Sequence, residues 1–189
     1  MSDTTIRKLA LGSGGIRFPG WIHVDIDPQW QPEVVADMRQ PLPFPDAYAD
    51  FIHSEDMVEQ LTLPEAEAFF RECHRVLKPG GVFRLLTIDL HRLMSMYVQG
   101  DLRLRELWER EVPEIPLRQR TLGEVVNLAM LFSNHHFVYD EQSLRAAMEP
   151  AGFRLQRVDY RESQWPELRG LDVRSPQNAV SMYFDCEKL

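Results

Sequence analysis

The chain alternates short apolar runs with longer stretches in which apolar residues recur at helical spacing. Short apolar runs between turn residues predict strands, and an i, i+3, i+4 spacing predicts helices. The expected strands are Arg7–Leu11, Trp21–Asp25, Glu33–Ala36, Ala49–His53, Val82–Ile88, Phe153–Tyr160 and Ala179–Asp185. Strands that alternate with helices predict an α/β fold with a mostly parallel sheet.

Capping residues mark where several helices begin. Thr62 and Glu65 have the spacing of a capping box, and the glycines after Lys78 would end that helix. Further helices are expected after Asp89, over Leu122–Phe132 and from Asp140 to about Glu149. Residues 100–120 contain Pro113 and Pro116 and predict no clear element, and Arg161–Asn178 is expected to be a long polar loop.

The length and net charge of the chain limit the classes of protein to which it can belong. A chain of 189 residues suits one domain, 1–189, and its net charge of −8 argues against nucleic acid or an anionic membrane as partner. We find no secretory signal in the polar start and no apolar run long enough to span a membrane. Cys73 and Cys186 form neither a metal framework nor a disulfide scaffold, so a cytoplasmic protein without a metal site is expected.

Chemistry is expected at the carboxyl ends of the first four strands, because ligands bind at that edge of open α/β sheets. Glycines after the first strand let the backbone approach a ligand closely. A carboxylate after the second strand can accept both hydroxyls of a ribose, and one after the third can accept from the amine of adenine. The residues at these positions are Gly12, Gly14, Asp25, Asp37, Ser54 and Glu55.

The glycine turn does not fit a dinucleotide site. Arg17 stands where the third glycine of G-x-G-x-x-G is expected, and residues 12–20 are too few to hold a crossover helix. Without that helix, much of the N-terminus that would hold a pyrophosphate is missing. A cofactor with one nucleoside and no phosphate is therefore favoured over NAD or FAD.

Several segments in order resemble the class I S-adenosylmethionine-dependent methyltransferases. They are LALGSGG, WIHVDID, ADMRQPLPFPDAYADFIHSED, FFRECHRVLKPGGVFRLLTID, HHFVYDEQSLRAAMEPAGF and SMYFDCEK. The chain is most similar to a group of small methyltransferases with a shortened first crossover (type 11-like). The resemblance implies a Rossmann-like sheet of about seven strands with an antiparallel last strand, a cofactor-binding half at 1–90 and substrate-covering elements at 91–189.

The resemblance also assigns roles to residues. Gly12, Ser13 and Gly14 would line the methionine part of S-adenosylmethionine, and Asp25 would hold the ribose hydroxyls. Around the adenine and the sulfonium, the implied contacts are Ile26, Asp37, Met38 and Ser54. The family usually has Glu-His after the fourth strand where this chain has Glu59-Gln60, so no role is carried over for that histidine.

Methyl transfer needs a base only when the acceptor must lose a proton. The candidates are His135, His136 and Asp89, and His135 is preferred because the resembled family usually has histidine at that position. The alternative for each is a structural role, as a helix cap or a packing residue. Trp108, Phe132, Phe137 and Trp165 could line an apolar substrate pocket or belong to the core.

The resulting hypothesis is a methyltransferase for a small molecule or for a glycan or cell-surface precursor. A methyltransferase-like binding or scaffolding protein without turnover is the alternative, and a NAD-dependent oxidoreductase is a third. The sequence predicts neither the acceptor atom nor the oligomeric state.

Overall fold

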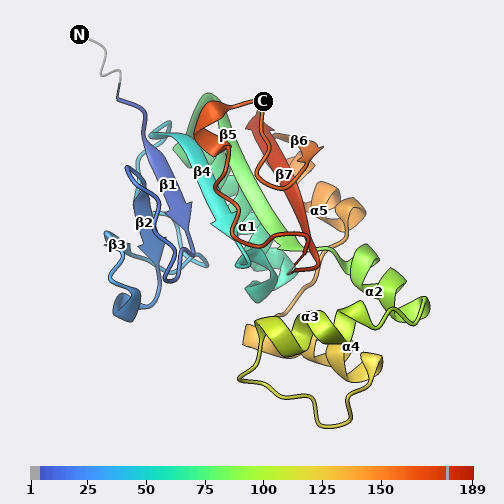
Figure 1. Ribbon diagram of the computed structural model, residues 1–189. Coiled ribbons are helices and arrows are strands. Elements are labelled where there is room, and N and C mark those ends of the chain that lie inside the picture. Colours follow the sequence, from blue (N-terminus) through green and yellow to red (C-terminus); the bar gives the residue numbers. More distant parts are fainter. Residues whose placement is uncertain (1–4, 178) are drawn as a thin grey trace.

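A computed structural model describes residues 5–177 and 179–189 and shows one seven-stranded sheet (Figure 1). The strand order is β3-β2-β1-β4-β5-β7-β6, and β7 alone runs antiparallel to its neighbours, as the resemblance implied. The strands are β1 Lys8–Leu11, β2 Ile22–Asp25, β3 Val34–Val35, β4 Ala49–Glu55, β5 Leu77–Ile88, β6 Phe153–Val158 and β7 Ser181–Lys188. The prediction of an α/β fold is confirmed.

Two helices cover one face of the sheet. α1, Leu63–Val76, and α5, Glu141–Met148, contribute their apolar stripes to the main core. The predicted capping box of α1 is present, since the Thr62 N–H donates to Glu65 Oε2 at 2.8 Å. The Ser143 N–H likewise donates to the Asp140 carboxylate at 2.8 Å, so Asp140 caps α5 as expected.

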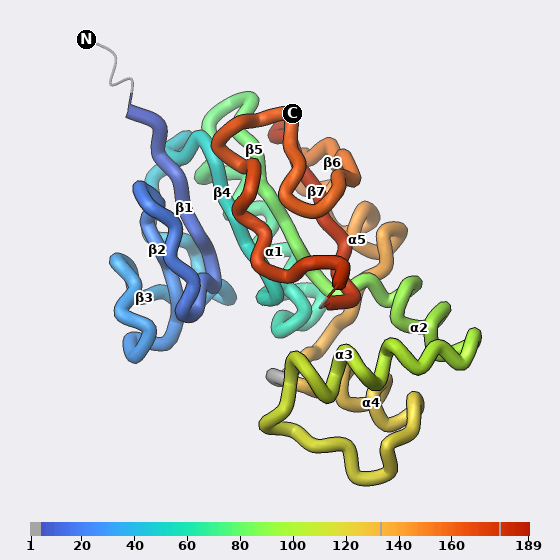
Figure 2. Tube along the Cα trace, viewed as in Figure 1, coloured from blue at the N-terminus to red at the C-terminus, as the bar shows by residue number. Residues whose placement is uncertain are grey.

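The opposite face is covered by a loop rather than by helices. Residues 159–177 and 179–180, which we call the covering loop, cross β4 and β5 between β6 and β7 (Figure 2). Leu168 of this loop packs with Trp21, Phe51 and Val82 in a small core of its own. The segment between β1 and β2 contains no helix, so the shortened crossover is also confirmed.

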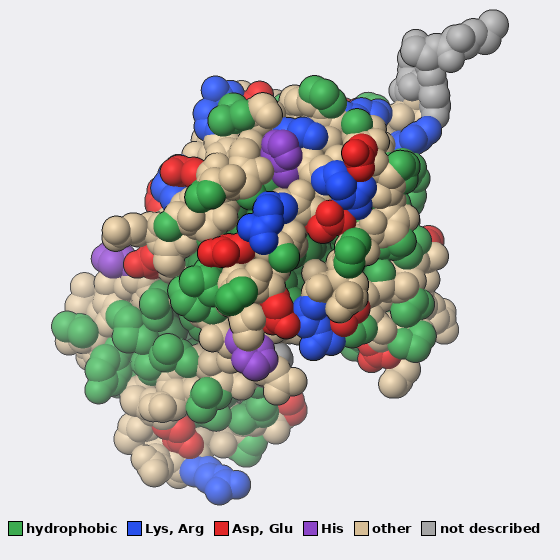
Figure 3. Space-filling model, turned by 180° about the vertical axis from the view of Figure 1, so that it is seen from behind, with side chains coloured by type: hydrophobic (Ala, Val, Ile, Leu, Met, Phe, Trp, Pro, Cys, Tyr) green, Lys and Arg blue, Asp and Glu red, His purple; other side chains and the backbone are tan. Residues whose placement is uncertain are grey.

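Three further helices form a separate unit beyond the carboxyl end of β5 (Figure 1). They are α2 Leu90–Val98, α3 Arg103–Glu111 and α4 Leu122–Leu131, and they share an apolar cluster around Leu93 and Trp108. Hydrophobic side chains are also exposed over this unit (Figure 3), among them Val98, Leu102 and Leu131.

Some predicted boundaries were wrong. α3 forms within the stretch that predicted no element, and it ends before Pro113. β4 continues two residues beyond His53, while β3 holds only two residues. Phe132 leaves α4 and begins a short 3-10 turn. The start at 1–4, where we saw no signal segment, and Asn178 of the long loop lie outside the described residues.

Within the described ranges, no helix is long and apolar enough to cross a membrane. A search of the same residues finds no group of three or more histidine, cysteine or acidic side chains that could hold a metal ion.

Candidate active site

The glycine turn after β1 is tied to the end of β2 by one carboxylate. The Gly14 N–H donates to Asp25 Oδ2 at 2.7 Å, and the Asp27 N–H donates to Asp25 Oδ1 at 2.9 Å. Gly12 has a φ of +64°, and a Cβ built there would lie 2.3 Å from Met57 Cγ, so glycine is required. Each Asp25 oxygen keeps a further lone pair for a ligand hydroxyl.

A cavity of about 720 Å³ opens at this edge of the sheet, as expected for an α/β fold. Its walls come from the glycine turn, the ends of β2 and β4, and the covering loop. The residues that line it include Gly12, Ser13, Gly14, Asp25, Ile26, Trp30, Asp37, Met38, Glu55, Asp56, Gln60, His136 and Arg174. We call this space the nucleoside cavity.

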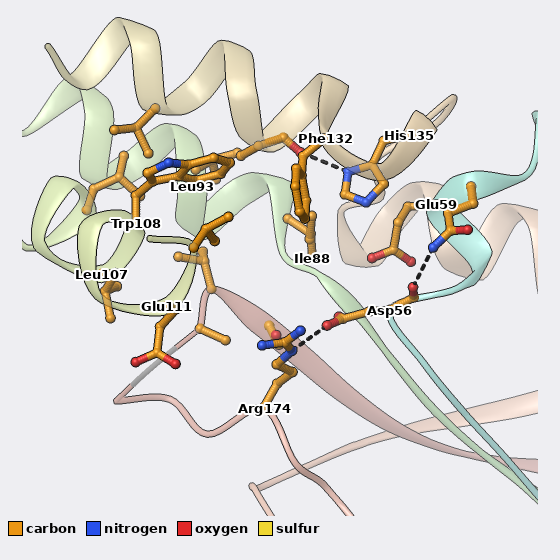
Figure 4. Close-up of a pocket in the computed structure, with 18 of the residues that line it drawn as sticks. Asp56, Glu59, Ile88, Leu93, Leu107, Trp108, Glu111, Phe132, His135 and Arg174 are labelled. Carbon is orange, nitrogen blue, oxygen red and sulfur yellow. Dashed lines mark hydrogen bonds and ion pairs between the residues drawn. The ribbon is translucent and has the colours of Figure 1, made fainter. Parts of the chain in front are cut away.

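A second pocket of about 380 Å³ lies between the sheet and the helical unit (Figure 4). Its walls are mainly apolar and come from α2, α3, α4 and the ends of β5 and β7. Among the lining side chains are Ile88, Leu93, Leu104, Trp108, Val125, Phe132 and Val180, with Glu59, Glu111 and His135 as polar members. We call this space the apolar pocket.

The two spaces share a wall formed by Asp56, Gln60 and Arg174. Arg174 Nε donates to Asp56 Oδ2 at 2.7 Å, and the Gln60 side-chain amide donates to the Asp56 carbonyl at 3.1 Å. Asp56 adopts a left-handed φ of +50°, which is rare for residues other than glycine and recurs at functional sites. Two ligands, one bound in each space, would therefore meet at this wall.

The covering loop is attached to the sheet by buried charged side chains. Arg84 of β5 is fully buried, and its guanidinium bonds to both oxygens of Asp172 and to Asp185 of β7. The Glu55 carboxylate accepts the N–H groups of Val173 and Arg174. Burial, reinforced by the charge of Asp56, raises the pKa of Glu55 to about 7.

Comparisons with known proteins show which families and structures the chain resembles. Residues 22–85, from β2 into β5, match the family model described as a methyltransferase domain. An uncharacterized methyltransferase of Synechocystis sp. is 36% identical over 62 residues, which make up 33% of this chain and 28% of that protein. The chain thus spans much less than two thirds of that relative.

Solved structures share the whole fold. An S-adenosylmethionine-dependent methyltransferase of Archaeoglobus fulgidus superposes with a TM-score of 0.56 and 15% identity, covering 98% of this chain and 87% of that one. One of Mesorhizobium loti gives 0.55 and 14% identity, covering 97% and 91%. The chain thus shares the fold of these methyltransferases, and its residues 22–85 match the methyltransferase domain. Both solved proteins are named as S-adenosylmethionine-dependent, so this is the cofactor to compare with the cavity.

The charges around the nucleoside cavity fit S-adenosylmethionine. Its two arginines are already paired, Arg39 with Asp37 and Arg174 with Asp56, so the cavity is acidic overall. An acidic space suits a cationic sulfonium and disfavours a pyrophosphate. Ser13 contributes a buried hydroxyl that has no partner among the described residues, and Ile26 presents an exposed apolar side chain.

Seven of the eight residues predicted to touch the cofactor line the nucleoside cavity: Gly12, Ser13, Gly14, Asp25, Ile26, Asp37 and Met38. Ser54 does not. It is fully buried within β4, because the strand continues to Glu55 and places Glu55 and Asp56 at the cavity instead. Trp30 was not predicted, although it lines the cavity on a short turn after β2.

The three candidate bases lie in different places. His135 lines the apolar pocket, and its Nδ1 lies 2.9 Å from the Ala129 carbonyl, which can only accept, so Nε2 carries the lone pair. His136 lines the nucleoside cavity. Asp89 lines neither space: it caps α2 by accepting the Arg92 N–H at 3.0 Å and pairs with Arg157 at 2.7 Å. The structure thus shows the capping alternative for Asp89, away from both spaces.

Two of the four predicted pocket aromatics line the apolar pocket. Trp108 and Phe132 do so, with ring centroids 5.8 Å apart. Phe137 packs on Tyr139 at 4.8 Å against the main core, and Trp165 belongs to the small core under the covering loop.

Proposed function

We propose that the chain transfers a methyl group from S-adenosylmethionine to a small molecule with an apolar body. The observation that carries this proposal is the shared wall of Asp56, Gln60 and Arg174, which joins an acidic nucleoside cavity to an apolar pocket. Methyl transfer is an in-line displacement, so its main requirement is that donor and acceptor meet in a fixed geometry.

In this proposal the cofactor supplies an electrophilic methyl group, and the chain holds the cofactor and the acceptor in position. Asp25 accepts the ribose hydroxyls while it holds the glycine turn. Ile26 and Met38 flank the adenine, Asp37 accepts from its amine, and Gly12 to Gly14 follow the methionine part. His136 contributes to the wall of the same cavity, and His135 offers Nε2 to the acceptor pocket.

The shape of the apolar pocket favours a small apolar acceptor over a glycan. A sugar needs many hydrogen-bonding partners, whereas most side chains around this pocket are aliphatic or aromatic. We retain the cytoplasm as the expected compartment, because Cys73 and Cys186 are buried free thiols.

Calorimetric titration with S-adenosylhomocysteine, S-adenosylmethionine and NAD tests the proposal. The two adenosyl compounds should bind and NAD should not. The variant Asp25→Asn should weaken the adenosyl affinity tenfold or more, about 1.4 kcal/mol. Asp46→Asn is the matched control, since the Asp46 side chain is 81% exposed and lies outside both spaces.

The alternatives predict different results. A scaffolding protein would bind S-adenosylmethionine without methylating any member of a broad acceptor panel. An oxidoreductase would bind NAD. Failure of both adenosyl compounds to bind would overturn the proposal.

A further inference from the structure

Glu59 is a buried carboxyl group on the wall of the apolar pocket (Figure 4). The residue is fully buried, and the Thr87 hydroxyl donates to its Oε2 at 3.0 Å. Its other oxygen, Oε1, has no hydrogen-bond partner among the described residues. A buried polar atom without a partner is costly, so one that faces a ligand pocket indicates a group that the ligand satisfies.

The charges around the pocket favour a cation. Four acidic side chains line it, those of Asp56, Glu59, Glu111 and Glu114, against one arginine, Arg174. Asp56 is paired with Arg174 and Glu111 with Arg110, which leaves Glu59 and Glu114 without a basic partner among the described residues. Burial lowers the pKa of His135, so this imidazole is neutral at pH 7 and does not offset them. An anionic acceptor would be repelled, whereas an ammonium group would be attracted.

The remaining walls would hold an apolar body next to that charge. Trp108 and Phe132 meet edge to face, and Leu93, Leu104 and Val125 complete the surface. Glu59 lies close in sequence to Asp56 and Gln60, which form the wall shared with the nucleoside cavity. A group bound to Glu59 would therefore lie near the end of the pocket that faces the methyl donor.

Resting on the proposed function, we infer that the acceptor is a primary or secondary amine with an apolar body, and that Glu59 binds its nitrogen. The Glu59 carboxylate takes one proton from the bound ammonium and frees the nitrogen lone pair. A nitrogen–carbon bond then forms as the carbon–sulfur bond of the donor breaks, and that electron pair stays on sulfur. The product leaves as a methylated ammonium, and Glu59 keeps the proton that it took from the substrate.

The protonation of Glu59 provides a readout that a purely structural residue would not give. Burial, together with the charge of Asp56, raises the pKa of Glu59 to about 8, so the free protein holds a proton there at pH 7. The other ionisable groups of this region are His135, Tyr139 and Arg174. An alkylammonium, with a pKa near 10 as in lysine, should displace that proton on binding.

Calorimetry with three probes that share a phenethyl group tests the inference on protein saturated with S-adenosylhomocysteine. The probes are phenethylamine, phenethyl alcohol and hydrocinnamate. We expect phenethylamine to bind at least tenfold more tightly than the other two. Titrations at pH 7 in two buffers of different ionisation enthalpy should show release of a proton to the buffer for the amine alone.

Substitutions at Glu59 test whether this residue causes the amine preference and the proton release. Glu59→Gln should abolish the amine preference and the proton release while the affinity for S-adenosylhomocysteine stays unchanged. Glu59→Asp should restore part of both if the shape of the pocket is preserved. Glu106→Gln, at an exposed α3 residue outside both spaces, should behave as the unaltered protein.

Three outcomes would overturn the inference: equal binding of the alcohol or the carboxylate, binding of none of the probes, or an amine preference that survives in Glu59→Gln. Each leaves the proposed function standing as long as S-adenosylhomocysteine binds. If S-adenosylhomocysteine did not bind, the proposed function itself would be rejected.

Discussion

Arg174 of the covering loop donates to Asp56, just beyond β4, at 2.7 Å, across 118 positions of sequence. This pair closes the wall between the nucleoside cavity and the apolar pocket. The carboxylate of neighbouring Glu55 accepts the backbone N–H groups of Val173 and Arg174, so the loop is attached on both sides of the wall. The covering loop is therefore part of the site and not only a cover for the sheet.

Breaking this pair should affect binding more than stability. Both side chains are partly exposed, and such pairs contribute only about 0.2–1 kcal/mol. Arg174→Gln should therefore shift the thermal midpoint by only a few degrees. It should weaken S-adenosylhomocysteine binding about threefold to tenfold, up to ~1.4 kcal/mol, because the wall opens. An unchanged affinity in calorimetry would show that the loop has no part in the site.

Removing the anchor beneath the loop should destabilise the whole fold. Asp172 and Arg84 are both fully buried, so Asp172→Asn would leave the guanidinium without its main counter-charge. Loss of one partner of a buried pair costs about 3–5 kcal/mol. Urea unfolding measures this loss, with Asp46→Asn as the exposed control. A loss below about 1 kcal/mol would mean that water replaces the carboxylate.

The two glycines of the turn should differ in their tolerance of alanine. Both have positive φ, so both variants lose about 1 kcal/mol from backbone strain. In Gly12→Ala the new Cβ also overlaps the Met57 side chain, at 2.3 Å from Cγ, which adds about 1–3 kcal/mol. At Gly14 a Cβ would meet no atom within 4 Å. Equal losses in urea unfolding would contradict the close approach at Gly12.

The Glu59 carboxyl should make stability depend on pH in a defined direction. Its pKa is about 8 in the folded protein and near the ordinary 4.5 when unfolded. Between these values the folded state holds a proton that the unfolded state has released, so the free energy of unfolding falls as pH rises. The pKa of Glu55, raised to about 7, acts in the same direction.

Glu59→Gln isolates this contribution, because the amide stays neutral at every pH. Its thermal midpoint relative to the unaltered protein should therefore increase from pH 6 to pH 9. Glu106→Gln should follow the unaltered protein across the range. A constant difference between Glu59→Gln and the unaltered protein would show that Glu59 titrates normally.

Local signals explain which parts of the site the sequence could predict. A glycine turn and a carboxylate at a strand end are read from a few neighbouring residues, and Gly12, Gly14 and Asp25 all line the cavity. Ser54 was misplaced because β4 runs two residues further than its apolar pattern indicates. Since side chains alternate between faces, a small error in a strand end changes which residue meets the ligand.

Long-range contacts account for what the sequence did not reveal. Arg174 and Asp172 lie in a polar loop and acquire their roles only through Asp56 and Arg84, which are distant in the chain. Glu59 is likewise fully buried, and its partner Thr87 lies 28 positions away in the chain. α3 was missed because its N-cap, Leu102, makes no side-chain capping bond.

A crystal structure with S-adenosylhomocysteine bound tests the central claim most directly. The account predicts that the ribose hydroxyls bond to Asp25 and that the sulfur faces the wall of Asp56, Gln60 and Arg174, toward the apolar pocket. A nucleoside bound away from Asp25, or a sulfur that points away from this wall, would contradict it.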